Sequence, residues 1–139
     1  MITSFRKDFY IIMDQTFMTY HEQTDIDNTL RLREILKTLP PFAKDYFRAI
    51  EPTTSTRTRI SYAYDIRVFF QFLLNENPAF KNISMSEISV SVLDQIKALD
   101  IEEYLEYLKV YGDRENLHTN GERALKRKMV ALRGFYAYY

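Results

Sequence analysis

The groups best suited to chemistry in this sequence are guanidinium and hydroxyl groups at the start of one predicted helix. The stretch from Thr56 to Leu74 lacks proline and glycine, and its apolar residues recur at the spacing of one helix face. Ser55 or Thr56 can cap its first turn, and Asn77-Pro78 ends it.

Basic and hydroxyl side chains therefore lie beside the unpaired backbone N–H groups of that first turn, which favours phosphate binding. The residues concerned are Arg57, Thr58, Arg59 and Ser61. The alternative is a core helix with a solvated basic end, and this helix alone leaves both interpretations open.

A second basic cluster lies on the helix predicted at the end of the chain. Thr119 and Glu122 have the spacing of a capping box, so we expect the helix to begin there and to run to Tyr139. One face is apolar, and the opposite face and its flanks carry Asn120, Arg123, Lys126, Arg127, Lys128 and Arg133. The helix dipole adds positive potential at this end. Gly121 and Gly134 remove side-chain bulk, which suits close approach to a surface.

Composition bounds the fold class and the compartment. The chain has 139 residues, 46% of them hydrophobic, which is enough for one domain with a core plus an appendage. It has no cysteine, which excludes disulfides and thiolate metal sites and predicts a cytoplasmic protein. No apolar run is long enough to cross a membrane, and no signal peptide opens the chain.

The formal charge of zero hides a segregation of charge along the chain. Acidic residues dominate between Ser84 and Leu108, whereas basic residues dominate between Asn120 and Arg133. A basic face of this kind indicates a surface for a polyanion.

The remaining patterns predict helices almost throughout. Two apolar stripes, from Phe5 to Tyr20 and from Ile26 to Leu39, precede a linker at residues 51–54. Capping-box spacings at Ser84/Glu87 and Asp100/Glu103 predict two further helix starts, and the second helix should end between Lys109 and Gly112. We expect a polar loop over residues 113–120, and the only candidate strand is residues 88–92.

Residues that could support catalysis or hold a metal are weakly arranged. The two histidines, His21 and His118, are far apart and lack a supporting ligand motif, so we expect no metal site. Tyr136 and Tyr139 fall on the apolar stripe, so they and Tyr138 are better explained by packing than by nucleophilic attack. The acidic run at Glu102-Glu103 lacks the pattern of a Ca²⁺-binding loop and indicates a solvated helix face. We therefore expect no cofactor and no catalytic residue in this chain.

From Thr56 onward the sequence resembles the core-binding domain of tyrosine recombinases, the phage-integrase family. In the first helix of that domain a Thr is followed by a Tyr four positions on, by an Asp and an aliphatic residue seven and eight positions on, and by an aromatic-aliphatic pair at the end. The last helix of the domain reads roughly Arg-x-x-x-Ala-Leu-Arg-x-Phe-Phe-x-Tyr. The matching positions are Thr58, Tyr62, Asp65, Ile66, Phe72, Leu73, Arg127, Ala131, Leu132, Arg133, Phe135, Tyr136 and Tyr138. The middle of the chain, from Ile83 to Leu105, also follows the family pattern.

This resemblance implies an all-α fold, a four-helix SAM-like bundle over residues 55–139, preceded by a helical extension over residues 1–54 that has no counterpart in the minimal family pattern. In the family this bundle clamps double-stranded DNA together with a separate catalytic domain, which we expect to be absent from this chain. The implied DNA contacts are Arg57, Thr58, Arg59, Ser61, Asn120, Arg123, Lys126, Arg127 and Lys128. Implied roles are DNA integration and recombination, with further recombinase protomers on the DNA and no small-molecule substrate.

A hypothesis from another class stays open at this stage. The aromatic-rich first 54 residues could instead belong to a helical protein–protein interaction domain that docks a partner helix. DNA binding predicts a steep dependence on salt, whereas docking predicts a large apolar patch and little salt dependence.

Overall fold

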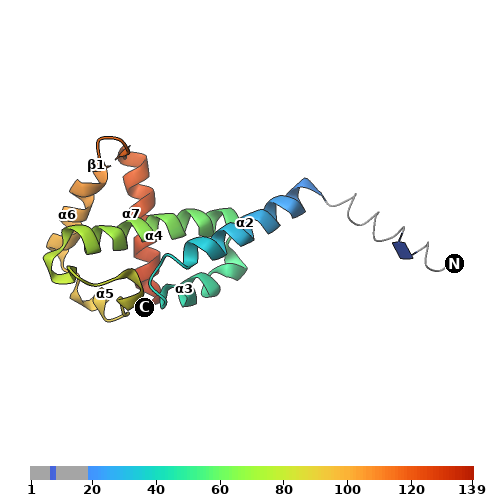
Figure 1. Ribbon diagram of the computed structural model, residues 1–139, viewed down its shortest axis with the longest axis horizontal. Coiled ribbons are helices and arrows are strands. Elements are labelled where there is room, and N and C mark those ends of the chain that lie inside the picture. Colours follow the sequence, from blue (N-terminus) through green and yellow to red (C-terminus); the bar gives the residue numbers. More distant parts are fainter. Residues whose placement is uncertain (1–6, 9–18) are drawn as a thin grey trace.

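The computed structural model describes residues 7–8 and 19–139, and within this part the protein is helical with one small hairpin (Figure 1). The longer elements are α2 (Tyr20–Leu36), α3 (Ala43–Ala49), α4 (Thr56–Glu76), α6 (Ala98–Lys109) and α7 (Glu122–Tyr138). The shorter ones are η1 (Glu51–Thr53), η2 (Pro78–Phe80), η3 (Met85–Glu87), α5 (Val92–Gln95), β1 (Val110–Gly112) and β2 (Leu117–Thr119). The prediction of a helical bundle is confirmed.

Helix α4 is the central element, and its sequence accounts for both of its ends. The Ser55 side chain accepts a hydrogen bond from the Thr58 N–H, and Pro78 follows directly after the C-cap. The predicted apolar stripe of α4 is buried from Ile66 to Leu73, while Tyr62 packs at the edge of the core.

The other long helices pack around α4. In Figure 1, α2 lies alongside α4, and α7 crosses it on the way to the C-terminus. Phe135 of α7 contacts Phe70 of α4 and Tyr46 of α3, with ring centroids 5.9 and 5.3 Å apart. Tyr46 also explains Gly134, since a Cβ there would lie 3.1 Å from the Tyr46 hydroxyl. Gly134 therefore makes room for α3, not for an approaching ligand as its sequence position suggested.

Residues on both sides of the predicted boundary at residue 54 share one core. Leu32, Ile35 and Phe47 belong to the same buried cluster as Phe69 and Phe135. The described residues on the two sides of residue 54 thus pack together, and the division of the chain into an extension and a bundle stays a prediction. The stripe from Phe5 to Tyr20 lies outside the described residues except for Tyr20, which is exposed.

The predicted polar loop over residues 113–120 is wrong in part, because the chain forms a β-hairpin there. Strands β1 and β2 pair antiparallel, with Tyr111 opposite His118 and Gly112 opposite Leu117. The candidate strand at residues 88–92 is also wrong, since that stretch carries no strand and α5 starts at Val92. Strands of three residues are too short to show the alternation on which a sequence-based prediction depends.

Three predicted helix starts also differ from the structure. Ser84 bonds the Glu87 carboxylate at 3.0 Å and begins only a short 3-10 turn. Helix α6 begins at Ala98, where Asp100 accepts from the Lys97 N–H at 2.8 Å. Thr119 lies in β2, and α7 begins after Gly121 without a side-chain cap. In the last two cases Asp100 and Glu122 lie inside the first turn of the helix.

Replacing Gly112 by Ala should destabilise the hairpin. Gly112 has φ +96°, and a Cβ on it would lie 2.1 Å from the Asn116 carbonyl oxygen. A non-glycine residue in this region costs about 1–3 kcal/mol, and urea denaturation followed by circular dichroism should report a loss of that size for Gly112→Ala. Arg114→Ala in the same turn is the control, since this exposed residue should change stability by less than about 0.5 kcal/mol. Equal stability of the two variants would contradict the strained geometry at Gly112.

Candidate nucleic-acid interface

A groove with a volume of about 480 Å³ lies between α4, the hairpin and α7. It is lined mainly by polar, aromatic and basic side chains: Ser61, Tyr64, Asp65, Arg67, Val68, Gln71, Tyr111, His118, Arg127 and Lys128. Segments from the two helices singled out in the sequence thus meet at one surface.

One face of α4 forms the floor of this groove. Ser61, Tyr64 and Val68 are three and four residues apart, so they project from the same side of the helix. Arg57 precedes Ser61 by one turn on that side and is exposed. Arg57 therefore extends the floor of the groove toward the N-terminus of α4.

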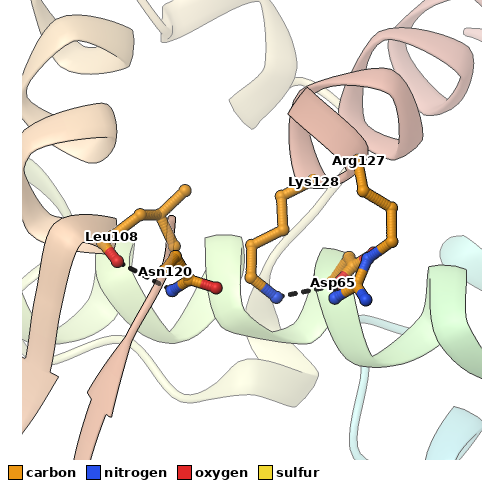
Figure 2. Close-up of polar contacts among 5 residues, drawn as sticks. All are labelled: Asp65, Leu108, Asn120, Arg127 and Lys128. Carbon is orange, nitrogen blue, oxygen red and sulfur yellow. Dashed lines mark hydrogen bonds and ion pairs between the residues drawn. The ribbon is translucent and has the colours of Figure 1, made fainter. Parts of the chain in front are cut away.

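A buried ion pair joins α4 to α7 at the centre of the groove (Figure 2). One oxygen of Asp65 accepts from Nζ of Lys128 at 2.8 Å and from Nη2 of Arg127 at 3.1 Å. The Asp65 side chain is 1% exposed and that of Lys128 is 7% exposed. A carboxylate buried this deeply requires a cationic partner, because an unpaired buried charge is strongly unfavourable. The pair therefore holds the crossing of the two helices.

Arg127 and Lys128 differ in what they offer to a ligand. The side chain of Arg127 is 56% exposed, so it touches Asp65 and still lies open to solvent. Lys128 is buried and its charge is used by Asp65, so it is not part of the accessible surface. The sequence carried a signal for this, because Lys128, Leu132 and Phe135 share the spacing of the buried face of α7.

Arg59 is the second predicted contact that the fold buries. Its Nη1 donates to the carbonyl oxygens of Glu51 at 2.9 Å and of Thr54 at 3.2 Å, which fastens η1 to α4. Arg59 also lies on the core face of its helix, four residues before Ala63. It points away from the groove, since it is two positions from Ser61, roughly 200° around the helix.

The remaining predicted residues divide into structural and accessible ones. Asn120 is half-buried and donates to the Leu108 carbonyl oxygen at 2.7 Å, which ties the start of α7 to α6 (Figure 2). Thr58 is half-buried at the Ser55 cap. Arg123 is exposed, and Lys126 is exposed beside Glu122 at 3.3 Å.

Two further arginines near the groove were missed by the sequence analysis. Arg31 of α2 donates to the Tyr64 hydroxyl at 3.1 Å, and its guanidinium carbon lies 5.7 Å from the centre of the Tyr64 ring. Arg67 covers the same ring at 4.9 Å. No local pattern links Arg31 to Tyr64, since the two residues are 33 positions apart and meet only because α2 packs along α4.

Stacked rings form the side of the groove at the hairpin. Tyr111 stacks on His118 with ring centroids 4.9 Å apart and planes at 17°, and on Tyr107 at 5.1 Å and 26°. His118 is thus a wall of the groove and not an isolated polar residue. The stack fixes the orientation of the hairpin on α6.

The tyrosines near the C-terminus lie in surroundings that disfavour nucleophilic attack. The hydroxyl of Tyr136 is buried and has no partner among the described residues, and burial raises its pKa to about 12. Tyr139 donates to the Phe42 carbonyl oxygen, and burial raises its pKa to about 12 as well. A phenolate is the attacking species, and raising the pKa lowers its population.

Other kinds of site are also missing from residues 7–8 and 19–139. No group of three or more His, Cys, Asp or Glu side chains in these ranges could hold a metal ion. None of the helices described combines the length and the apolar character that a membrane span requires. His21 is exposed on α2.

Comparison with known proteins gives two relatives. The chain is 29% identical over 118 residues to the tyrosine recombinase XerC of Caldanaerobacter subterraneus subsp. tengcongensis, an alignment of 78% of this chain and 31% of that protein. It is 25% identical over 120 residues to the tyrosine recombinase XerS of Lactococcus lactis subsp. cremoris, covering 81% and 32%. The chain is distantly homologous to tyrosine recombinases. No family model and no solved structure matches it.

The extent of the match corrects one expectation. Residues 55–139 are fewer than 78% of the chain, so the similarity to XerC includes part of the first 54 residues, which we expected to have no counterpart in the minimal family pattern. This agrees with the core that both segments share. The chain spans about a third of the length of the curated relatives that it matches.

Replacing Asp65 by Asn should destabilise the fold, because Lys128 would stay buried without an anion. Breaking one side of a buried pair costs about 3–5 kcal/mol, whereas replacing both partners by apolar residues of similar size is close to neutral. Chemical denaturation should therefore show a large loss for Asp65→Asn and recovery of most of it in Asp65→Leu/Lys128→Met. If the double variant is as unstable as the single one, the cost lies in packing and not in the unpaired charge.

Proposed function

We propose that this chain is a DNA-binding part of a site-specific tyrosine recombinase and that the groove between α4, the hairpin and α7 is its DNA-binding face. The observation that carries the proposal is that arginines from two helices line one groove, Arg67 of α4 and Arg127 of α7. Arg57 and Arg123 are exposed and lie one helical turn before the lining residues Ser61 and Arg127, so we expect them to extend the same face. Homology to tyrosine recombinases supports the same function.

The charge of this face favours a polyanion. Asp65 is the only acidic residue that lines the groove, and it is buried against Lys128, so it contributes little negative potential outside. Arg127 and Arg67 line the groove, and Arg31 lies beside it on Tyr64. The exposed acidic residues Glu102, Glu103 and Glu106 lie on α6, away from the groove lining.

The chemistry of the groove suits the DNA backbone better than base edges. A guanidinium group can donate two parallel hydrogen bonds to the oxygens of one phosphate. Hydroxyl and amide groups such as those of Ser61 and Gln71 add neutral hydrogen bonds. Such contacts position a protein on duplex DNA without selecting a sequence. We therefore expect weak binding with little sequence preference, with a Kd on the order of 10⁻⁴–10⁻⁶ M at physiological salt.

Replacing Arg57 and Arg127 by Ala should weaken duplex binding from two different helices. Each lost phosphate contact should lower the slope of log K against log salt by about one unit, and the double variant should lower it by about two. Fluorescence anisotropy with a labelled duplex at several salt concentrations measures both quantities. Folding should be retained, because Lys128 still pairs with Asp65 when Arg127 is removed.

Lys81→Ala is the matched control for this experiment. Lys81 is exposed and lies beyond the other end of α4, after η2, so its removal should leave the salt slope unchanged. Unchanged affinity in the Arg57→Ala/Arg127→Ala variant, with an intact circular dichroism spectrum, would place the DNA-binding face elsewhere.

Within this proposal, the chain by itself does not cut DNA. Phosphoryl transfer needs an activated nucleophile and cations on the transition-state charge, and the raised pKa values of Tyr136 and Tyr139 work against the first. Supercoiled plasmid incubated with the purified chain should stay supercoiled. Relaxation that is lost on replacing the exposed Tyr138 by Phe would contradict this expectation.

A further inference from the structure

A second cavity, with a volume of about 450 Å³, lies between α2, α3 and the start of α4. It is on another side of α4 from the DNA-binding groove, because Arg59 lines this cavity whereas Ser61 lines the groove. The DNA-binding function proposed above gives this cavity no role.

Arg59 gives the cavity an unused hydrogen-bond donor. The residue is 7% exposed, and its Nη1 is held by two backbone carbonyls of the η1 turn. Its Nε is buried and has no hydrogen-bond partner among the described residues. A buried donor on a charged group is costly to leave unpaired, and the Nε edge of a guanidinium matches the two oxygens of a carboxylate.

Further cations surround this donor. Arg33, Lys37, Lys44 and Arg48 also line the cavity, and Glu51 is the only acidic residue in its lining. Lys37 pairs with Glu34 and Arg48 with Asp45, both within one exposed helical turn, and such pairs are weak. Arg33 and Lys44 make no ion pair in the part of the chain that the structure describes.

Apart from Thr29 and Thr56, the rest of the lining is apolar, which distinguishes this cavity from a phosphate site. Leu32, Leu36 and Phe47 lie among the cations. A nucleic-acid backbone leaves such side chains without a partner, whereas an acidic peptide can place an aliphatic side chain on them beside its carboxylate. Apolar contact and charge complementarity together favour a peptide.

We propose that this cavity binds an acidic peptide segment of a partner protein. One Asp or Glu carboxylate of the segment accepts from Arg59, a neighbouring aliphatic side chain covers Leu32, Leu36 and Phe47, and Arg33 and Lys44 bind further acidic residues at the rim. The chain thus has two separate anion sites, one for DNA and one for a protein. This second site lies in the region that the sequence left open for protein docking.

The test uses the full chain and a fluorescein-labelled, acetylated 12-residue peptide of glutamate and leucine in a helical repeat. Its control is the same peptide with every Glu replaced by Gln. Anisotropy should show saturable binding of the acidic peptide only. Arg33→Gln/Lys44→Gln, which changes two exposed residues, should weaken it by about tenfold or more, the effect of losing charge-assisted hydrogen bonds. Arg59→Lys should weaken it similarly, and the ¹⁵Nε signal of Arg59 should shift on peptide addition.

The same variants separate this site from the DNA-binding face. Arg33→Gln/Lys44→Gln should leave duplex affinity unchanged, whereas Arg57→Ala/Arg127→Ala should leave peptide affinity unchanged. The proposal is overturned if the acidic peptide does not bind at millimolar concentration, if the Gln peptide binds equally well, or if the Arg59 signal stays in place. Loss of duplex binding in Arg33→Gln/Lys44→Gln would make the cavity part of the DNA surface instead.

Discussion

The buried carboxylate of Asp65 is the interaction on which the arrangement of the two basic helices depends. It lies buried on α4 beside Ile66 and lines the groove, and one of its oxygens is paired with both Lys128, which enters the interior beside it, and Arg127. This pairing sets where α7 crosses α4. One turn of α7 then buries Lys128 and leaves Arg127 partly in solvent, so the same contact that holds the bundle also orients an accessible arginine.

Local signals were enough to predict α4, whereas tertiary contacts decided much of the site. Ser55 and Pro78 are local signals for the ends of α4 that do not depend on tertiary contacts. The apolar spacing places Ile66 and Leu73 in the core. The sequence predicts Arg59 and Lys128 as DNA contacts, although their spacing from Ala63 and Leu132 puts both on buried faces. The hairpin could not be predicted, because it rests on the positive φ of Gly112 and on the Tyr111–His118 stack.

The fold separates charge as well as holding helices together. Acidic residues of α6 lie apart from the groove, basic residues of α4 and α7 line it, and another set of cations surrounds Arg59 beyond the far side of α4. A chain with a formal charge of zero can therefore present two positive surfaces. Arg31 of α2 completes the edge of one, and Arg33, two positions on, lines the other. Helix α2 thus contributes side chains to both surfaces.

The most direct test of the central claim is solution NMR of the ¹⁵N-labelled chain titrated with a short DNA duplex. We expect the largest shift changes on the groove and on the helical turns next to it, and we expect them to diminish as salt is raised. The amides concerned are those of Arg57, Ser61, Tyr64, His118, Arg123 and Arg127. The amides of α5 and of the exposed face of α6 should stay in place. Changes centred on α6, or an unchanged spectrum at low salt, would contradict the assignment of this groove as the DNA-binding face.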